Sequence, residues 1–133
     1  MNKKYWQFAV VGGIGFVVDL TTMSLLSIAM PLFTARCFAF FIAANSNWLL
    51  NRNITFAAQN SQTSLSLQEN ISQWTKFICS SCVGAIPNLV CYWGLITGFS
   101  LTGALAVFAI IPGILMGILV NFTLADRWVF QQP

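Results

Sequence analysis

An aspartate lies inside one of the most apolar stretches of the sequence. Asp19 follows Phe8 by eleven residues, which in a helix is about 16 Å along the axis. If that helix crosses a bilayer, the carboxylate lies near the midplane, where an ionised group costs about 3 kcal/mol. Asp19 could bind a proton, a cation or sugar hydroxyls. It could also rest protonated, or form an interhelical hydrogen bond to Asn88 or to a group on the second helix.

Asparagines occupy related places in the other apolar segments. Asn88 directly follows Pro87, whose missing N–H frees a carbonyl and can kink a helix. Asn88 could therefore line a cavity or satisfy the freed backbone. Asn47 and Asn121 each end an apolar segment, and Arg52 or Arg127 follows. Together these residues could grip an anionic phosphate, whose oxygens suit the arginine fork. The same residue types also end helices and mark a cytoplasmic boundary.

Two further basic residues belong to this set of candidates. Arg36 stands near the opposite ends of the apolar segments, where it could snorkel to outer headgroups or receive a phosphate. Lys76 directly precedes the third apolar segment and would add positive charge on the inner side. Both residues are therefore candidate contacts for an anionic head.

Other chemistry is not supported by the composition. The chain has no histidine, and we find no acid pair, Gly-rich phosphate loop or nucleophile with a base, so neither an enzyme nor a cofactor is expected. Cys79 and Cys82 have a redox or metal spacing, but nothing completes a metal site, and we interpret them as small apolar residues. The net charge of +3 is too small to suggest nucleic-acid binding.

Long apolar segments must position these residues. Of the 133 residues, 57% are hydrophobic and 7% are charged, whereas a soluble domain has about 25% charged residues. Segments near the ~20 residues that span a bilayer predict four transmembrane helices in a single domain, residues 1–133. We expect them at about 8–30, 34–50, 77–99 and 101–124. The predicted fold is an all-α, multi-pass membrane protein.

The basic residues predict the orientation. Five of the six lie on one side, which places both termini and the loop 51–75 in the cytoplasm by the positive-inside rule; they are Lys3, Lys4, Arg52, Lys76 and Arg127. Within the loop, "SLQE" at Ser66–Glu69 is a capping-box pattern. It predicts a short amphipathic helix over 66–75 on the inner membrane face.

The sequence also contains an internal repeat. A pattern of one aromatic, two small and one polar residue occurs twice, 69 residues apart. The first copy is Phe8, Gly12, Gly15 and Asp19, and the second is Phe77, Ser81, Gly84 and Asn88. Adding 74 relates two small-xxx-small stripes that end in asparagine: Ala39, Ala43 and Asn47 become Gly113, Gly117 and Asn121. Small residues let helices approach closely. We therefore predict two parallel-repeat helical hairpins, packed through these glycines and alanines.

Four stretches in order resemble the GtrA-like family of small bacterial membrane proteins. They are "FAVVGGIGFVVD", "NSNWLLNRNITF", "KFICSSCVGAIPN" and "NFTLADRWVF". The resemblance implies translocation of polyprenyl-phosphate-linked sugars from the inner to the outer leaflet of the bacterial inner membrane, for cell-surface polysaccharide synthesis. The sequence departs at Asp126, which stands where the first half has Arg52, so the two arginines need not contact phosphate equivalently.

We therefore expect a flippase for a polyprenyl-phosphate monosaccharide, with no catalytic residues. The sugar-phosphate head would pass Asp19, Asn47, Asn88 and Asn121, while the polyprenyl tail stays among membrane lipids. Because four helices can hardly enclose a sugar, we expect a homodimer. One alternative is a scaffold that recruits a polyprenyl-phosphate glycosyltransferase, and another is a small proton-coupled exporter.

Overall fold

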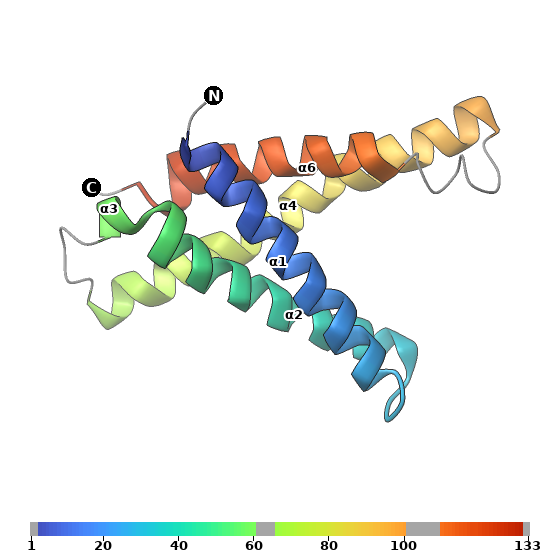
Figure 1. Ribbon diagram of the computed structural model, residues 1–133, viewed down its shortest axis with the longest axis horizontal. Coiled ribbons are helices and arrows are strands. Elements are labelled where there is room, and N and C mark those ends of the chain that lie inside the picture. Colours follow the sequence, from blue (N-terminus) through green and yellow to red (C-terminus); the bar gives the residue numbers. More distant parts are fainter. Residues whose placement is uncertain (1–2, 61–65, 101–109, 132–133) are drawn as a thin grey trace. The chain divides into compact units, whose positions relative to one another are not determined.

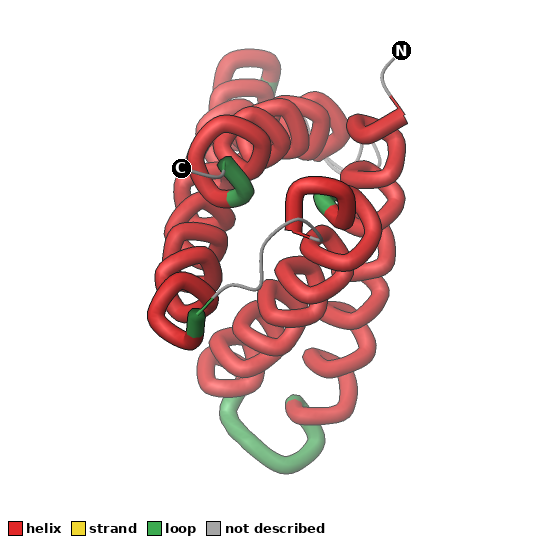
Figure 2. Tube along the Cα trace, turned by 90° about the vertical axis from the view of Figure 1, so that its left-hand side faces the viewer, coloured by secondary structure: helices red, strands yellow, loops and turns green. Residues whose placement is uncertain are grey.

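The computed structural model describes residues 3–60, 66–100 and 110–131. All regular structure in those ranges is helical, as Figures 1 and 2 show. The elements are α1 (Lys3–Leu26), α2 (Leu32–Leu50), η1 (Asn51–Thr55), α3 (Ala57–Asn60), α4 (Leu67–Phe99), α6 (Ile110–Leu124) and η2 (Ala125–Val129). Over this part of the chain the prediction of an all-α protein is confirmed.

The chain divides into two compact units. An N-terminal unit extends from Met1 to Trp74, and a C-terminal unit from Thr75 to Gln131. Helix α4 begins in the first unit and continues into the second. In the N-terminal unit α1 packs on α2 and η1, and these elements are called the N-terminal pair. In the C-terminal unit α4 meets α6 at Gly84 and Asn121, and Phe77 of α4 meets Phe130 after η2. The C-terminal pair is therefore α4 from Phe77 onward with α6 and η2.

The helices differ in their ends from the predicted segments. Helix α1 begins at Lys3 and ends at Leu26, because nothing before Phe8 breaks a helix, and a turn follows Leu26. Helix α2 begins at Leu32 directly after Pro31, since proline suits the start of a helix but not its interior. The first nine residues of the predicted segment 101–124 lie outside the described residues, and α6 is the rest of it.

The segment predicted as a cytoplasmic loop is largely helical. It holds η1, α3 and the first turns of α4. The capping box is confirmed: the Ser66 N–H donates to Glu69 Oε2 at 2.7 Å, and the Glu69 N–H donates to Ser66 Oγ at 3.3 Å. Hydrogen bonds from the backbone and the side chain of Ser66 lower the pKa of Glu69. The helix that starts there does not stop at 75, however; α4 continues through Pro87 to Phe99.

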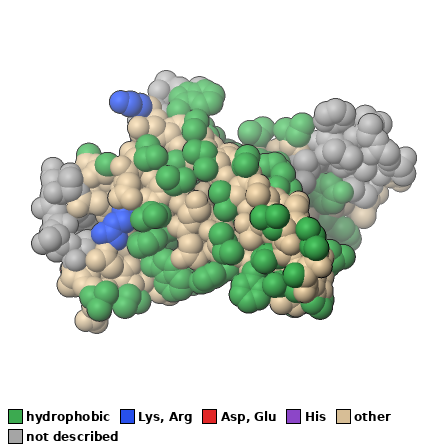
Figure 3. Space-filling view, turned by 60° about the horizontal axis from the view of Figure 1, so that its bottom comes forward, with side chains coloured by type: hydrophobic (Ala, Val, Ile, Leu, Met, Phe, Trp, Pro, Cys, Tyr) green, Lys and Arg blue, Asp and Glu red, His purple; other side chains and the backbone are tan. Residues whose placement is uncertain are grey.

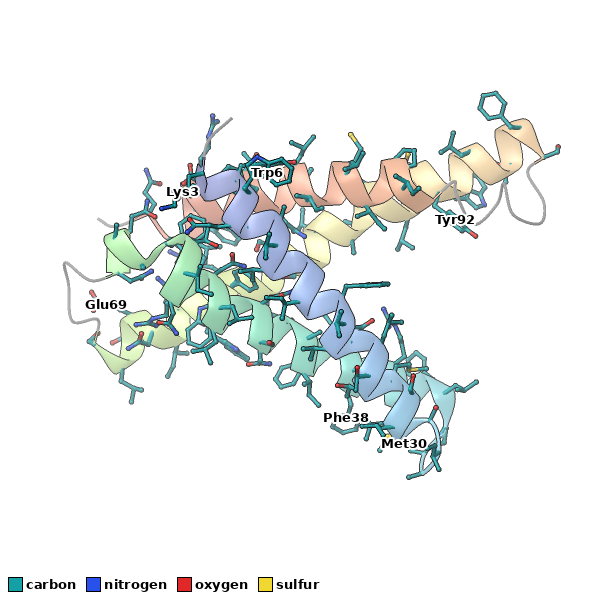
Figure 4. The ribbon with its side chains drawn as sticks, in the orientation of Figure 1. Lys3, Trp6, Met30, Phe38, Glu69 and Tyr92 are labelled. Atoms are coloured by element: carbon teal, nitrogen blue, oxygen red, sulfur yellow. The ribbon has the colours of Figure 1, made fainter. Side chains whose placement is uncertain are left out.

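The N-terminal pair is an antiparallel hairpin. Helices α1 and α2 lie side by side on either side of the turn at 27–31 (Figure 1). Figure 4 labels Lys3 and Trp6 at one end of this hairpin and Met30 and Phe38 near the other. The buried positions of α1 recur at helical spacing: Phe8, Val11 and Gly15. Those of α2 are small: Ala35, Ala39, Ala43 and Ala44. Small side chains allow the close approach of the two backbones.

Large apolar side chains point outward from these helices. Val10, Phe16 and Val17 of α1 are exposed, whereas Gly15 on the same helix is buried. Figure 3 shows apolar side chains over much of the face in view, with basic side chains at few points. Two of the described helices, α1 and α4, are long and apolar enough to cross a bilayer. Small residues inside and large apolar residues outside are the arrangement expected of helices in lipid.

Candidate functional site

An ion pair joins the two helices of the N-terminal hairpin. Arg36 of α2 donates from its Nη1 to Asp19 Oδ2 of α1 at 2.6 Å. Both residues lie within apolar helices, with Asp19 ten residues before Ala29 at the centre of the turn and Arg36 seven residues after it. The long arginine side chain spans the remaining difference in level between the two helices. The contact is short and charge-assisted, which makes it one of the stronger kinds of hydrogen bond.

The two partners of this ion pair differ in exposure. The Asp19 side chain is 14% exposed and the Arg36 side chain is 55% exposed. The second carboxylate oxygen, Asp19 Oδ1, is buried and has no hydrogen-bond partner among the described residues. Buried polar atoms normally have a partner. The ion pair thus has an exposed cation and a carboxylate with one oxygen that the described part of the chain leaves without a donor.

One turn before Asp19, an asparagine from α2 packs on a glycine. A Cβ built on Gly15 would overlap with the side-chain amide of Asn47, so only glycine leaves room for this amide. The Asn47 Oδ1 atom is buried and has no hydrogen-bond partner among the described residues. The structure therefore places Asn47 against α1, the helix that contains Asp19.

Arg52 lies in a polar network at the end of the hairpin away from the turn. Its Nη1 donates to Asn70 Oδ1 and, at 3.4 Å, to Gln73 Oε1. Gln73 in turn donates to Asn60 Oδ1 at 3.0 Å, and Asn60 donates to the Arg52 carbonyl at 3.3 Å. The Arg52 guanidinium also lies 5.5 Å from the centre of the Trp48 ring. Arg52 thus ties η1 and α3 to the first turns of α4.

A second contact holds the start of α4 to α2. The Trp74 indole N–H donates to Asn45 Oδ1 at 2.8 Å, and its ring meets Phe41 edge to face at 6.1 Å. Asn45 is fixed by a 2.7 Å hydrogen bond from its amide to the Phe41 carbonyl. Trp74 therefore has a defined protein partner at this end of the hairpin, where aromatic residues are typical of a membrane interface.

The C-terminal pair repeats the packing of the N-terminal pair. A Cβ built on Gly84 would overlap with the Asn121 amide, and Asn121 Oδ1 is also buried without a hydrogen-bond partner among the described residues. Gly113 and Gly117 are buried in α6, as Ala39 and Ala43 are in α2. The predicted repeat is thus visible as equivalent contacts within each unit.

The ends of both pairs also match. Each ends in a π-helix, η1 or η2, that is followed by a buried phenylalanine. The Phe56 N–H donates to the Asn51 carbonyl at 2.8 Å, and the Phe130 N–H donates to the Ala125 carbonyl at 2.9 Å. These phenylalanines meet Phe8 and Phe77 edge to face, at 6.4 Å and 6.1 Å between ring centres. Lys4 adds a cation 4.5 Å from the centre of the Phe56 ring.

The remaining predicted site residues are less well connected. Asn88 lies in α4, but its side chain is outside the described part of the structure. Lys76 is half-buried, and Arg127 in η2 is exposed. Gly12 has open space around it, so this position does not need glycine for close packing. Asp19, Arg36 and Asn47 are therefore the predicted residues that come together, around one face of α1.

Metal chemistry gains no support from the described residues. Cys79 and Cys82 are exposed free thiols. Within 3–60, 66–100 and 110–131, no three metal-binding side chains come together.

The interhelical hydrogen bond between Asp19 and the second helix, one of the alternatives left open by the sequence, is confirmed. The sequence did not identify Arg36 as the partner, although the two opposite charges lie on consecutive helices of one hairpin. The π-helices η1 and η2 were not predicted.

Comparison with known proteins identifies one family. The profile described as "GtrA/DPMS, transmembrane domain" matches residues 7–130, which takes in both helix pairs and both π-helices. No curated protein and no solved structure matches the chain.

Proposed function

Because this membrane protein belongs to the GtrA/DPMS transmembrane-domain family, we propose that it translocates a polyprenyl-phosphate-linked monosaccharide across the bacterial inner membrane. The family is associated with functions related to membrane sugar lipids. The observation that carries the proposal is the Asp19–Arg36 ion pair within an apolar hairpin. The product would serve cell-surface polysaccharide synthesis or glycosylation.

The ion pair has the chemistry that a sugar phosphate requires. The Arg36 guanidinium is the more exposed partner and suits phosphate oxygens through its planar set of N–H donors. A carboxylate such as that of Asp19 can accept a hydrogen bond from a sugar hydroxyl. A charged group inside a membrane is costly, and such residues typically mark a substrate pathway. Asp19 and Arg36 are therefore the central residues of the proposed path.

The proposal keeps the predicted topology. Four transmembrane helices with both termini in the cytoplasm place the turn at 27–31 on the outer side and Arg52, Lys76 and Arg127 on the inner side. These basic residues would attract the anionic head to the inner leaflet, and Arg36 would receive it nearer the outer leaflet. Asn88 and Asn121 would line the rest of the path. The tail would remain in lipid, and a homodimer would complete the enclosure.

Reconstitution tests this function. The purified protein is placed in vesicles that carry a polyprenyl-phosphate hexose, and an impermeant sugar-modifying reagent measures how fast the inner lipid reaches the outside. We expect movement well above that of protein-free vesicles, without added enzyme. Arg36→Gln should slow the movement, whereas Gly12→Ala, which has open space around it, should not. A wild-type protein that moves no lipid would show that the proposed function is wrong.

One observation favours a second function from a different class. The Arg52 guanidinium donates to Asn70 and Gln73, so part of its donor capacity serves the fold and not a lipid head. A scaffold that stabilises a polyprenyl-phosphate glycosyltransferase would need only such a rigid structure. It predicts that the protein raises the activity of a co-reconstituted glycosyltransferase while the lipid itself does not cross the vesicle membrane.

A further inference from the structure

We infer that Asp19 is the internal competitor that displaces the lipid phosphate from Arg36. This inference rests on the proposed function and assigns separate roles to the two members of the ion pair. Arg36 binds the phosphate of the lipid head. Asp19 occupies the same guanidinium when no lipid is bound, and its return to Arg36 releases the lipid.

The geometry gives the two residues unequal access. Arg36 Nη1 contacts Asp19 Oδ2 at 2.6 Å, yet the Arg36 side chain is 55% exposed and the Asp19 side chain only 14%. A phosphate can therefore approach the guanidinium from outside the hairpin. The Asp19 carboxylate is largely buried in the hairpin. Substrate and carboxylate therefore differ in their access to the same cation.

Electrostatics makes such an exchange reversible. A carboxylate and a phosphate are both anions that bind a guanidinium through charge-assisted hydrogen bonds. In surroundings of low dielectric, an unpaired Arg36 would be costly, and Asp19 removes that cost in the empty protein. Once phosphate takes Arg36, Asp19 in turn lacks a cation. This penalty weakens lipid binding and favours release, as a transporter needs.

The sparse bonding of Asp19 supports this assignment. Its Oδ2 accepts from Arg36, while its Oδ1 is buried without a hydrogen-bond partner among the described residues. When phosphate takes Arg36, the Asp19 carboxylate needs another donor, and a sugar hydroxyl next to the phosphate is of the right kind. The substrate class that fits is a phospho-linked sugar with a free hydroxyl near its phosphate.

Only the N-terminal pair carries these charges. The residues at the repeat-related positions of Asp19 and Arg36 are Asn88 and Ile110. An amide and an aliphatic side chain cannot form an ion pair. The exchange therefore takes place once in each chain, at Arg36, and the C-terminal pair has no second phosphate position of this kind.

The amount of lipid bound by variants of Asp19 and Arg36 tests the inference. Wild type, Asp19→Asn and Arg36→Gln are purified in detergent, and polyprenyl-phosphate hexose is added to each. Mass spectrometry then measures how much of this lipid each protein retains. Removing the competitor should raise retained lipid, about fivefold for a partly exposed pair, and should slow flipping. Arg36→Gln should lower both the retained lipid and the flipping rate.

Glu69→Gln is the control, because it makes the same acid-to-amide change at an exposed site. It should change neither the retained lipid nor the flipping rate. If Asp19→Asn lowers retained lipid as Arg36→Gln does, the pair is structural and the inference is wrong.

A measurement on the wild-type protein covers the case in which a variant does not fold. Arginine side-chain nitrogen signals are recorded in nanodiscs while farnesyl phosphate is added, with farnesol as the control. The inference predicts that the Arg36 signal shifts with farnesyl phosphate and not with farnesol. An unchanged Arg36 signal would contradict the inference. Lipid movement by the same wild-type protein in vesicles would show separately that the proposed function still holds.

Discussion

The two helix pairs of this protein share their packing and differ in their polar chemistry. Both have an asparagine amide on a glycine and a π-helix that leads into a buried phenylalanine. The N-terminal unit has an ion pair between its helices, Asp19–Arg36, and the repeat-related positions of the C-terminal unit are the uncharged Asn88 and Ile110. Contacts that occur in both pairs are those needed to build such a pair. Charges that occur in one of them are the better candidates for function.

The predicted site residues divide into those that occur in both helix pairs and those that occur in one. Asn47 and Asn121 have the same surroundings in the two pairs, down to a buried oxygen without a partner among the described residues. By the criterion of the repeat they belong to the shared framework, although their oxygens remain available to a donor. Asp19 and Arg36 have no charged counterpart at the repeat-related positions. They therefore carry the functional assignment.

The largest expected effect concerns the shared phenylalanines. Phe56 and Phe130 are each 1% exposed, and truncation of a buried phenylalanine costs about 3 kcal/mol. Phe56→Ala and Phe130→Ala should lower the free energy of unfolding in mixed micelles by similar amounts. The exposed Phe38→Ala is the matched control and should cost much less. If only one of the two buried positions is sensitive, the pairs do not share this part of the framework.

A smaller effect is expected at the glycines that face asparagine. Gly15→Ala and Gly84→Ala place a methyl group where the Asn47 or Asn121 amide lies, and overpacking of this kind costs about 2 kcal/mol. Gly12→Ala meets open space and should be close to neutral. Thermal unfolding of the three variants in detergent separates these outcomes. A Gly12 variant as unstable as Gly15→Ala would argue against the Asn47 contact as the cause.

The arginines of the two π-helices should differ in their effect on stability. Arg52→Ala removes hydrogen bonds to Asn70 and Gln73 and should cost about 1 kcal/mol. Arg127 is exposed, and its replacement by alanine should change the free energy of unfolding by less than about 0.5 kcal/mol. Chemical unfolding of both variants tests the difference. Equal losses would mean that the Arg52 network does not distinguish the two pairs.

The smallest effect is a pH dependence at the start of α4. The pKa of Glu69 lies below its ordinary value because Ser66 donates hydrogen bonds to the carboxylate. This stabilisation is complete above the ordinary pKa of 4.5 and is lost as the pH falls through the lowered pKa of the folded state. Amide hydrogen exchange in the first turn of α4 should therefore speed up at acidic pH, beyond its intrinsic rate. In Glu69→Gln this additional change should be absent.

Much of the architecture could be predicted from residue patterns. The long apolar segments gave the helices, and the repeat of small residues ending in Asn47 and Asn121 identified contacts that the structure contains. Ser66 and Glu69 predicted a helix start to the residue, because a capping box depends only on neighbours in sequence. The all-helical fold and the family membership rest on such local and repeated signals.

The rest depends on contacts between elements. The residues from Asn51 to Thr75 are polar and suggested a loop, yet Arg52, Asn60 and Gln73 satisfy one another and keep the segment largely helical. No periodicity indicates that two amides will be paired in this way. For Arg36 the sequence left open contact with outer headgroups or with a phosphate, because it does not show how far a long side chain reaches back along its hairpin toward Asp19.

The central claim is that the charged pair of the N-terminal hairpin moves the lipid head. Flipping rates in vesicles test it most directly when Arg36→Gln is compared with Gly94→Ala, a variant of the C-terminal pair at a glycine with open space around it, at equal amounts of folded protein. We expect Arg36→Gln to reduce flipping of a polyprenyl-phosphate hexose at least tenfold (about 1.4 kcal/mol), while Gly94→Ala retains most of the rate. Wild-type flipping by Arg36→Gln would contradict it.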